Sequence, residues 1–97
     1  MIHVFQINEE LSGFEELKLE ENKVLFELLD PHKILLFVDE HTEKVWIWEG
    51  QNTSPRMKFI AARLAPNLRD REGFGFRISA ADGGDEPAAF KVLVGLV

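Results

Sequence analysis

The side chains that most often carry catalysis or bind metal ions are scattered along this sequence of 97 residues. The three histidines, His3, His32 and His41, share no spacing that would make a helical metal-binding pair. The stretch GFGF at 73–76 lacks the strand-then-helix setting of a phosphate-binding loop, and no serine lies in a nucleophile elbow. We therefore expect a protein that is not an enzyme and holds no metal.

Charge is distributed unevenly along the chain. Residues 1–49 hold twelve acids and four lysines, a net charge of −8, and most of these acids fall at expected solvated strand positions and turns. Residues 54–77 carry a net charge of +4. The basic residues of this segment are Arg56, Lys58, Arg63, Arg69, Arg71 and Arg77. A basic segment on an acidic body favours an acidic partner, although nearby acids could also balance it as a solvated helix face.

Composition indicates one globular domain spanning residues 1–97. The chain is 45% hydrophobic and 29% charged, which is ordinary for a folded protein. It has no cysteine, so neither a disulfide framework nor a thiolate metal site is expected. No apolar run approaches the roughly 20 residues that cross a bilayer, and the N-terminus does not read as a signal peptide. We expect a soluble, cytoplasmic protein.

Strand patterns dominate the first half. IHVFQI at 2–7 alternates in polarity and predicts a strand, and FEELKLE at 14–20 predicts a second, short one. NKVLFELLDP at 22–31 fits a helix or a strand, and Pro31 ends it. KILLFVD at 33–39 predicts a central strand that is covered on both faces.

VWIWEG at 45–50 predicts the partner strand, so that residues 33–49 form a hairpin. Because side chains alternate along a strand, Val45 and Ile47 should face one way and Trp46 and Trp48 the other. Gly50 is expected where a side chain would obstruct the turn into the next element.

The clearest helix start is Ser54 followed by Pro55, since serine caps helices well and the first helical position needs no amide hydrogen. The helix should run at least to Ala65, and Pro66 should kink or end it. REGFGFRISA at 71–80 predicts a strand, ADGGDEP at 81–87 a turn, and the residues from Glu86 onward a short final helix. The pattern is α+β.

This ordered set of features resembles the gelsolin-like domain family. The matching segments are the strand at 35–39, VWIWEG at 45–50, the helix at 54–68 and DGGDEPAAF at 82–90. The resemblance implies a central mixed sheet of about five strands between one long helix and one shorter helix, related to the ADF-homology fold. It also implies that both tryptophans lie buried under a helix instead of being displayed to a ligand.

The family typically binds actin, and its long helix inserts into a hydrophobic cleft between actin subdomains. At 100° per residue, the helix here should turn its sheet-facing side chains inward, namely Met57, Ile60, Ala61, Leu64 and Leu68. The expected partner-binding residues are Pro55, Arg56, Lys58, Phe59, Ala62, Arg63, Pro66 and Asn67. The alternative is that Phe59 packs under a neighbouring loop.

Calcium often regulates this family through an acid near the central strand and a glutamate on the long helix. Residues 54–68 contain neither Asp nor Glu, and Met57 or a close neighbour stands where that glutamate would be. Asp30, His32 and Lys33 lie near the strand start, whereas calcium prefers several oxygen ligands. We predict no cofactor and calcium-independent folding and binding, with DGGDE at 82–86 as a solvated turn.

Two other functions stay open at this point. One is a structural or self-assembling module without actin binding, associating through Phe59 or a sheet edge. The other is binding of anionic phospholipid by the basic segment 56–77. For the actin-binding hypothesis, a lone domain with one main site favours monomer sequestration or filament-end blocking, a monomeric state and no nucleic-acid partner.

Overall fold

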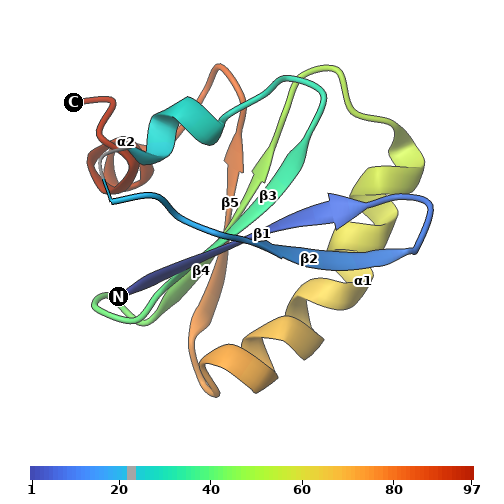
Figure 1. Ribbon diagram of the computed structural model, residues 1–97, viewed down its shortest axis with the longest axis horizontal. Coiled ribbons are helices and arrows are strands. Elements are labelled where there is room, and N and C mark those ends of the chain that lie inside the picture. The colour runs from blue at the N-terminus through green and yellow to red at the C-terminus, as the bar shows by residue number, and fades with distance from the viewer. Residues whose placement is uncertain (22–23) are drawn as a thin grey trace.

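A five-stranded mixed sheet lies between a long helix on one face and a shorter helix on the other (Figure 1). The computed structural model describes residues 1–21 and 24–97. Its elements in chain order are β1 (Ile2–Asn8), β2 (Gly13–Leu17), the 3-10 helix η1 (Leu25–Leu28), β3 (Ile34–Asp39), β4 (Lys44–Glu49), α1 (Pro55–Glu72), β5 (Arg77–Asp82) and α2 (Ala88–Val94). This architecture confirms the predicted α+β class.

The strand order is β2-β1-β3-β4-β5, which places β3 in the middle. All six residues of β3 are buried, as expected for an apolar strand that is covered on both faces. β3 pairs antiparallel with β1 and with β4, and the register Leu36↔Ile47 confirms the predicted hairpin. β5 joins the edge of the sheet parallel to β4, with α1 as the crossover between them.

The alternation along β4 divides the core in two. Val45 and Ile47 pack in the cluster under α1, whereas Trp46 and Trp48 pack in the cluster on the other face, with Phe90 of α2. The ring of Phe90 meets that of Trp46 at a centroid distance of 5.6 Å, in an edge-on arrangement. The prediction that both tryptophans are buried under a helix is therefore confirmed.

The segment that fits a helix or a strand contains the short helix η1, although Asn22 and Lys23 lie outside the described residues. Leu25, Leu28 and Leu29 pack against the cluster beneath α2, so this segment closes one end of that core.

Gly50 occupies a crowded turn, as predicted. A Cβ added there would lie 2.4 Å from the Pro31 carbonyl oxygen, far inside van der Waals contact. The Gly50 N–H donates to the Lys33 carbonyl at 3.0 Å, which holds the exit of β4 against the segment that enters β3.

α1 begins as predicted, because the Ser54 hydroxyl accepts the Met57 N–H at 3.1 Å and Pro55 takes the first helical position. Of the two predicted effects of Pro66, a kink or an end of the helix, the end is wrong, since α1 continues to Glu72. Pro66 cannot donate to the carbonyl of Ala62, but Ala62 is exposed to solvent. Burial of Leu68 one half-turn beyond the proline supports the continuation.

The long helix also shifts the next strand. The predicted strand at 71–80 begins instead at Arg77 and ends at Asp82, because Arg71 and Glu72 belong to α1. A tight turn follows the helix, in which the Phe76 N–H donates to the Gly73 carbonyl and Gly75 has a φ of +86°. Within residues 1–21 and 24–97, no helix has both the length and the apolar character that crossing a membrane requires.

Candidate partner-binding surface

α1 rests on the sheet through the side chains that the helical period predicts. Ile60, Ala61 and Leu68 are buried, and Met57 and Leu64 pack against the same cluster from the edge. Ala65, which was not in the predicted set, is buried as well. With this side fixed on the sheet, the opposite side of the helix must face outward.

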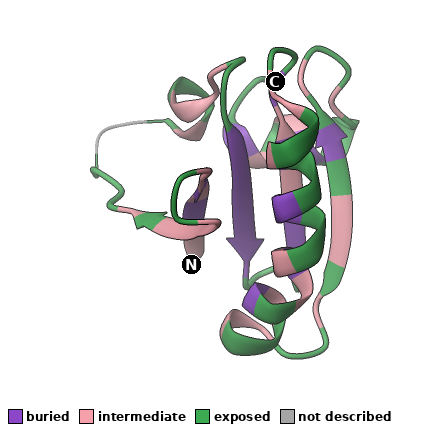
Figure 2. Ribbon diagram, turned by 90° about the vertical axis from the view of Figure 1, so that its right-hand side faces the viewer, coloured by how far each residue is buried: buried purple, intermediate pink, exposed green. Residues whose placement is uncertain are grey.

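The predicted partner-binding residues do lie on that outward side. Pro55, Arg56, Lys58, Phe59, Ala62, Arg63 and Asn67 are exposed, and Pro66 is half-buried. Phe59 keeps 67% of its surface accessible, so among the described residues no loop covers it and the alternative packing is wrong. Figure 2 looks onto this side, where the outward-facing turns of α1 are coloured as exposed.

Four apolar residues, Pro55, Phe59, Ala62 and Pro66, form the centre of this side and are called the outer stripe below. Phe59 is the one large side chain among them, and the rings of Pro55 and Pro66 are rigid. The outer stripe is therefore a line of apolar residues along one side of the helix, with Phe59 as its single bulky side chain. Such a shape suits insertion into a groove on another protein.

Two exposed apolar residues that sequence reasoning missed lie beyond the ends of α1. Leu11 is 74% exposed in the turn between β1 and β2, and Phe74 is 86% exposed in the turn after α1. The Leu11 N–H donates to Asn8 Oδ1 at 3.0 Å, and Ser12 adopts a positive φ of 50°. Turn-forming residues around each one, NEELSG and GFG, are the signal that would have found them.

The turn that carries Leu11 lies beside the start of α1. The Ser54 hydroxyl is 3.3 Å from Glu9 Oε2, and an Arg56 Nη2 donor lies 3.5 Å from the Ser12 hydroxyl. Arg56 and Phe59 are one helical turn apart and share a face. The exposed surface thus extends from the β1–β2 turn onto the outer stripe.

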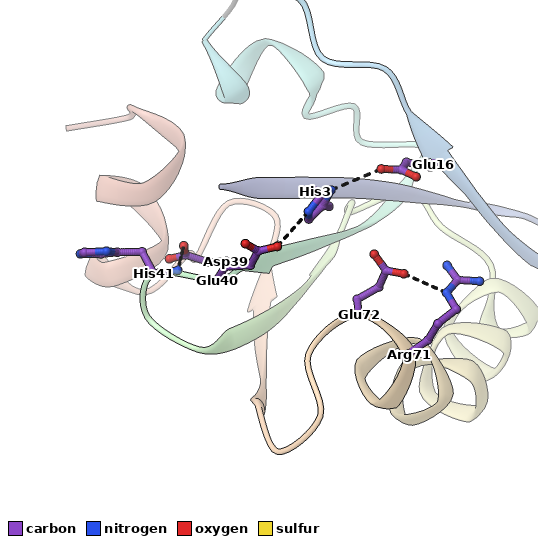
Figure 3. Close-up of polar contacts among 7 residues, drawn as sticks. All are labelled: His3, Glu16, Asp39, Glu40, His41, Arg71 and Glu72. Carbon is purple, nitrogen blue, oxygen red and sulfur yellow. Dashed lines mark hydrogen bonds and ion pairs between the residues drawn. The ribbon is translucent and has the colours of Figure 1, made fainter.

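The basic residues of α1 divide into two groups. Arg69 Nε lies 3.0 Å from Asp70 Oδ1, and Arg71 Nε lies 2.9 Å from Glu72 Oε2, the latter drawn in Figure 3. Within the part of the chain that the structure describes, Arg56, Lys58 and Arg63 form no ion pair, and residues 54–69 contain no acid. Nearby acids therefore balance the end of the helix and leave its first eleven residues positive.

The histidines do not assemble a site. His3 lies between two carboxylates, with Nε2 3.0 Å from Glu40 Oε1 and Nδ1 3.4 Å from Glu16 Oε2 (Figure 3). The carboxylates approach opposite ring nitrogens, so they are not arranged to share one metal ion with this histidine. Across residues 1–21 and 24–97, no cluster of three or more His, Cys, Asp or Glu side chains could hold a metal.

The residues near the position at which the family binds calcium make other contacts here. The Asp30 carboxylate accepts the His32 backbone N–H at 2.8 Å, in a turn that Lys33 follows. Met57 packs toward the core under α1. Calcium independence stays a prediction.

The opposite face of the sheet carries apolar hollows beside α2. One, of about 240 Å³, is lined in part by Trp46, Val92 and Leu93, and a second, of about 500 Å³, by Met1, Ile2 and Leu25 among others. The side chain of Val92, on α2, is 66% exposed to solvent.

A five-stranded mixed sheet held between one long and one short helix is the architecture expected of a gelsolin-like domain. Solved structures agree. The chain is similar to a protein in the Thorarchaeota ProGel/rabbit actin complex, with 27% identity, a TM-score of 0.80, and coverage of 98% of this chain and 100% of that one. It is also similar to a protein in the Thorarchaeota 2DGel3/rabbit actin complex, with 22% identity and a TM-score of 0.66.

The second match covers 92% of this chain and 43% of that chain, so this chain spans less than half of that protein. Both neighbours are described as actin complexes and neither as an enzyme. No protein-family model matches this chain, and no curated protein matches it.

Proposed function

We propose that this chain binds actin or an actin-like protein, and that it does so by docking the outer stripe of α1 into an apolar cleft of that partner. The observation that supports it most is the 67% exposure of Phe59, in the second turn of a helix whose other side is fixed on the sheet. A protein with 27% identity and the same fold has been crystallised as an actin complex.

Docking would bury side chains that solvent now surrounds. Removing one phenylalanine ring from water contributes about 1.5–3 kcal/mol, which makes Phe59 the main apolar anchor. Ala62 lets the partner approach the helix closely, and Asn67 offers a polar contact at the rim. One helix gives one main site, so the chain sequesters monomers or blocks a filament end and does not crosslink filaments.

The proposal includes binding without calcium. Residues 54–69 supply no carboxylate, and Asp30 directs a carboxylate oxygen at a backbone N–H. Calcium requires six to eight oxygen ligands, and carboxylates usually provide several of them. The chain offers too few at this position to make binding depend on the ion.

The test compares Phe59→Asp with Phe74→Asp in an assay of actin polymerisation. Both residues are exposed phenylalanines, so neither change should unfold the protein, and only Phe59 belongs to the outer stripe. We expect the wild type and Phe74→Asp to slow polymerisation alike and Phe59→Asp to lose at least tenfold in potency, since a charge replaces the anchor. Equal potency of Phe59→Asp and wild type would show that the outer stripe is not the contact.

Self-association is a second candidate, which the hollows beside α2 favour. Val92 and the apolar lining of these hollows lie on the face opposite α1, so two copies could associate there while the outer stripe stays free. Light scattering over a range of concentrations tests it. A mass that rises with concentration in the wild type and not in Val92→Glu would support this candidate, and a constant monomer mass would reject it.

A further inference from the structure

The first turn of α1 has an unusual charge for a helix. The N-terminus of a helix carries a partial positive charge, which acidic side chains normally offset. The first turn of α1 contains no acid, and Arg56 and Lys58 stand there instead. The carboxylate that reaches this end comes from the β1–β2 turn, where Glu9 Oε2 accepts the Ser54 hydroxyl at 3.3 Å, so two cations face one acid. Their positive charges add to the positive end of the helix dipole, where carboxylates would stabilise the helix more.

The positive charge also stays on the exposed side. Arg56 Nη2 lies 3.5 Å from the Ser12 hydroxyl, a neutral group that leaves the charge of the guanidinium in place. Arg63 lies one turn beyond Phe59 on the same side of the helix. Three cations therefore surround the one large apolar side chain of the outer stripe, whereas Arg69 and Arg71 are paired with adjacent acids.

The rest of the protein has the opposite sign. Residues 1–49 carry a net charge of −8 and the whole chain −6. An acidic partner would be repelled by this net negative charge and attracted by the cations on the outer side of α1. Such an arrangement selects one orientation before contact and raises the rate of association at low salt.

We infer that the cleft which receives Phe59 is bordered by carboxylates, and that Arg56, Lys58 and Arg63 steer this acidic partner onto α1. The inference rests on the proposed function, and it adds the chemistry of the partner surface and a role for each group. Phe59 holds the complex together once it has formed, whereas the three cations decide how fast and in which orientation it forms.

A protein cleft fits this surface better than an anionic membrane does. Helices that lie in a membrane interface insert several large apolar side chains along their own length, whereas α1 offers Phe59, with Leu11 beside it in the β1–β2 turn. The net negative charge of the rest of the protein would also be repelled by anionic lipid.

The test measures association and dissociation of labelled rabbit actin monomers by stopped flow, from about 25 to about 200 mM salt. The steering variant is Arg56→Gln, Lys58→Gln, Arg63→Gln. The matched control is Lys18→Gln, Arg69→Gln, Arg71→Gln, which removes the same number of charges elsewhere. Phe59→Ala is the third variant, and thermal unfolding confirms that all of them fold.

For the wild type we expect an association rate that falls at least tenfold across the salt range. The steering variant should associate at least tenfold more slowly at low salt, with a flat salt response and a dissociation rate within about twofold of the wild type. The control should behave as the wild type does. Phe59→Ala should dissociate faster and keep the salt response.

Actin binding with no salt response, or equal losses in the steering variant and its control, would overturn the inference and leave the proposed function intact. Failure of the wild type to bind actin at all would overturn both. A parallel arm uses vesicles of phosphatidylserine and phosphatidylcholine. Suppose that the wild type binds these vesicles, that the steering variant alone loses this binding, and that actin binding shows no salt response. Arg56, Lys58 and Arg63 would then serve lipid binding, and the inference would be overturned.

Discussion

The indole N–H of Trp48 donates a 2.9 Å hydrogen bond to Glu86 Oε2, which joins β4 to the segment that leads into α2. Residues 38 positions apart are thereby connected at the edge of the core under α2. Burial by itself raises the pKa of the Glu86 carboxyl. The Trp48 hydrogen bond, backbone N–H groups of Glu86 and Gly84 and the charge of Lys91 outweigh it, so that this pKa lies below its ordinary value of 4.5.

A carboxyl whose pKa is lowered by folding stabilises the protein above its unfolded pKa and loses that contribution as the pH falls through its folded pKa. We predict that Trp48→Phe lowers the free energy of unfolding by about 1 kcal/mol at neutral pH, less than a buried charged hydrogen bond would because Glu86 is partly exposed. The deficit should shrink as the pH is lowered below 4.5, where Glu86 becomes protonated in the unfolded chain.

Chemical denaturation over this pH range provides the measurement, with Trp46→Phe as the matched control. Trp46 is a buried tryptophan of the same strand, two positions away and on the same face. Its replacement should cost stability without any such dependence on acid. If the free energy of unfolding lost in Trp48→Phe stays the same as the pH is lowered, the role assigned to Glu86 is contradicted.

Gly50→Ala should destabilise the fold, because its Cβ would lie 2.4 Å from the Pro31 carbonyl oxygen and 2.7 Å from that of Asp30. Backbone must move to make room, at a cost of about 1–3 kcal/mol. Gly13→Ala is the control, since the nearest atom there is 3.7 Å away. Urea unfolding should separate the two variants clearly, and similar midpoints would count against the crowded turn.

Pro66→Ala should stabilise the protein by about 1–3 kcal/mol, since it restores an N–H to the interior of α1. The gain is reduced because proline also restricts the unfolded chain. Pro55→Ala makes the same chemical change at the first helical position, where no N–H is needed, and should alter stability little. Thermal unfolding of the two variants measures both effects on stability. A lower stability of Pro66→Ala than of the wild type would mean that the proline is required by the fold.

Calcium should change neither folding nor binding. We expect isothermal titration of the chain with calcium to give no heat of specific binding, and actin binding to be the same in calcium and in chelator. Asp30→Asn should leave both results unaltered, because its partner is a backbone N–H. Tight calcium binding by the wild type that Asp30→Asn abolishes would contradict the interpretation of the acid-free helix.

Local pattern determined much of this molecule from sequence alone. Alternation in VWIWEG placed Trp46 and Trp48 together on one face of the sheet, opposite Val45 and Ile47, and Ser54-Pro55 located the start of α1. The helical period separated Ile60 and Leu68 from Phe59. These features follow from residues close in sequence, whose spacing reflects the geometry of one strand or one helix.

Tertiary structure decided what depends on residues far apart in the chain. α1 passes through Pro66 because core contacts such as that of Leu68 outweigh one missing hydrogen bond, and no local rule contains that balance. The position of the β1–β2 turn beside Arg56 likewise came from chain folding, as did the open space around Phe59. Local spacing can direct a side chain outward, but only packing of the whole chain determines whether something else covers it.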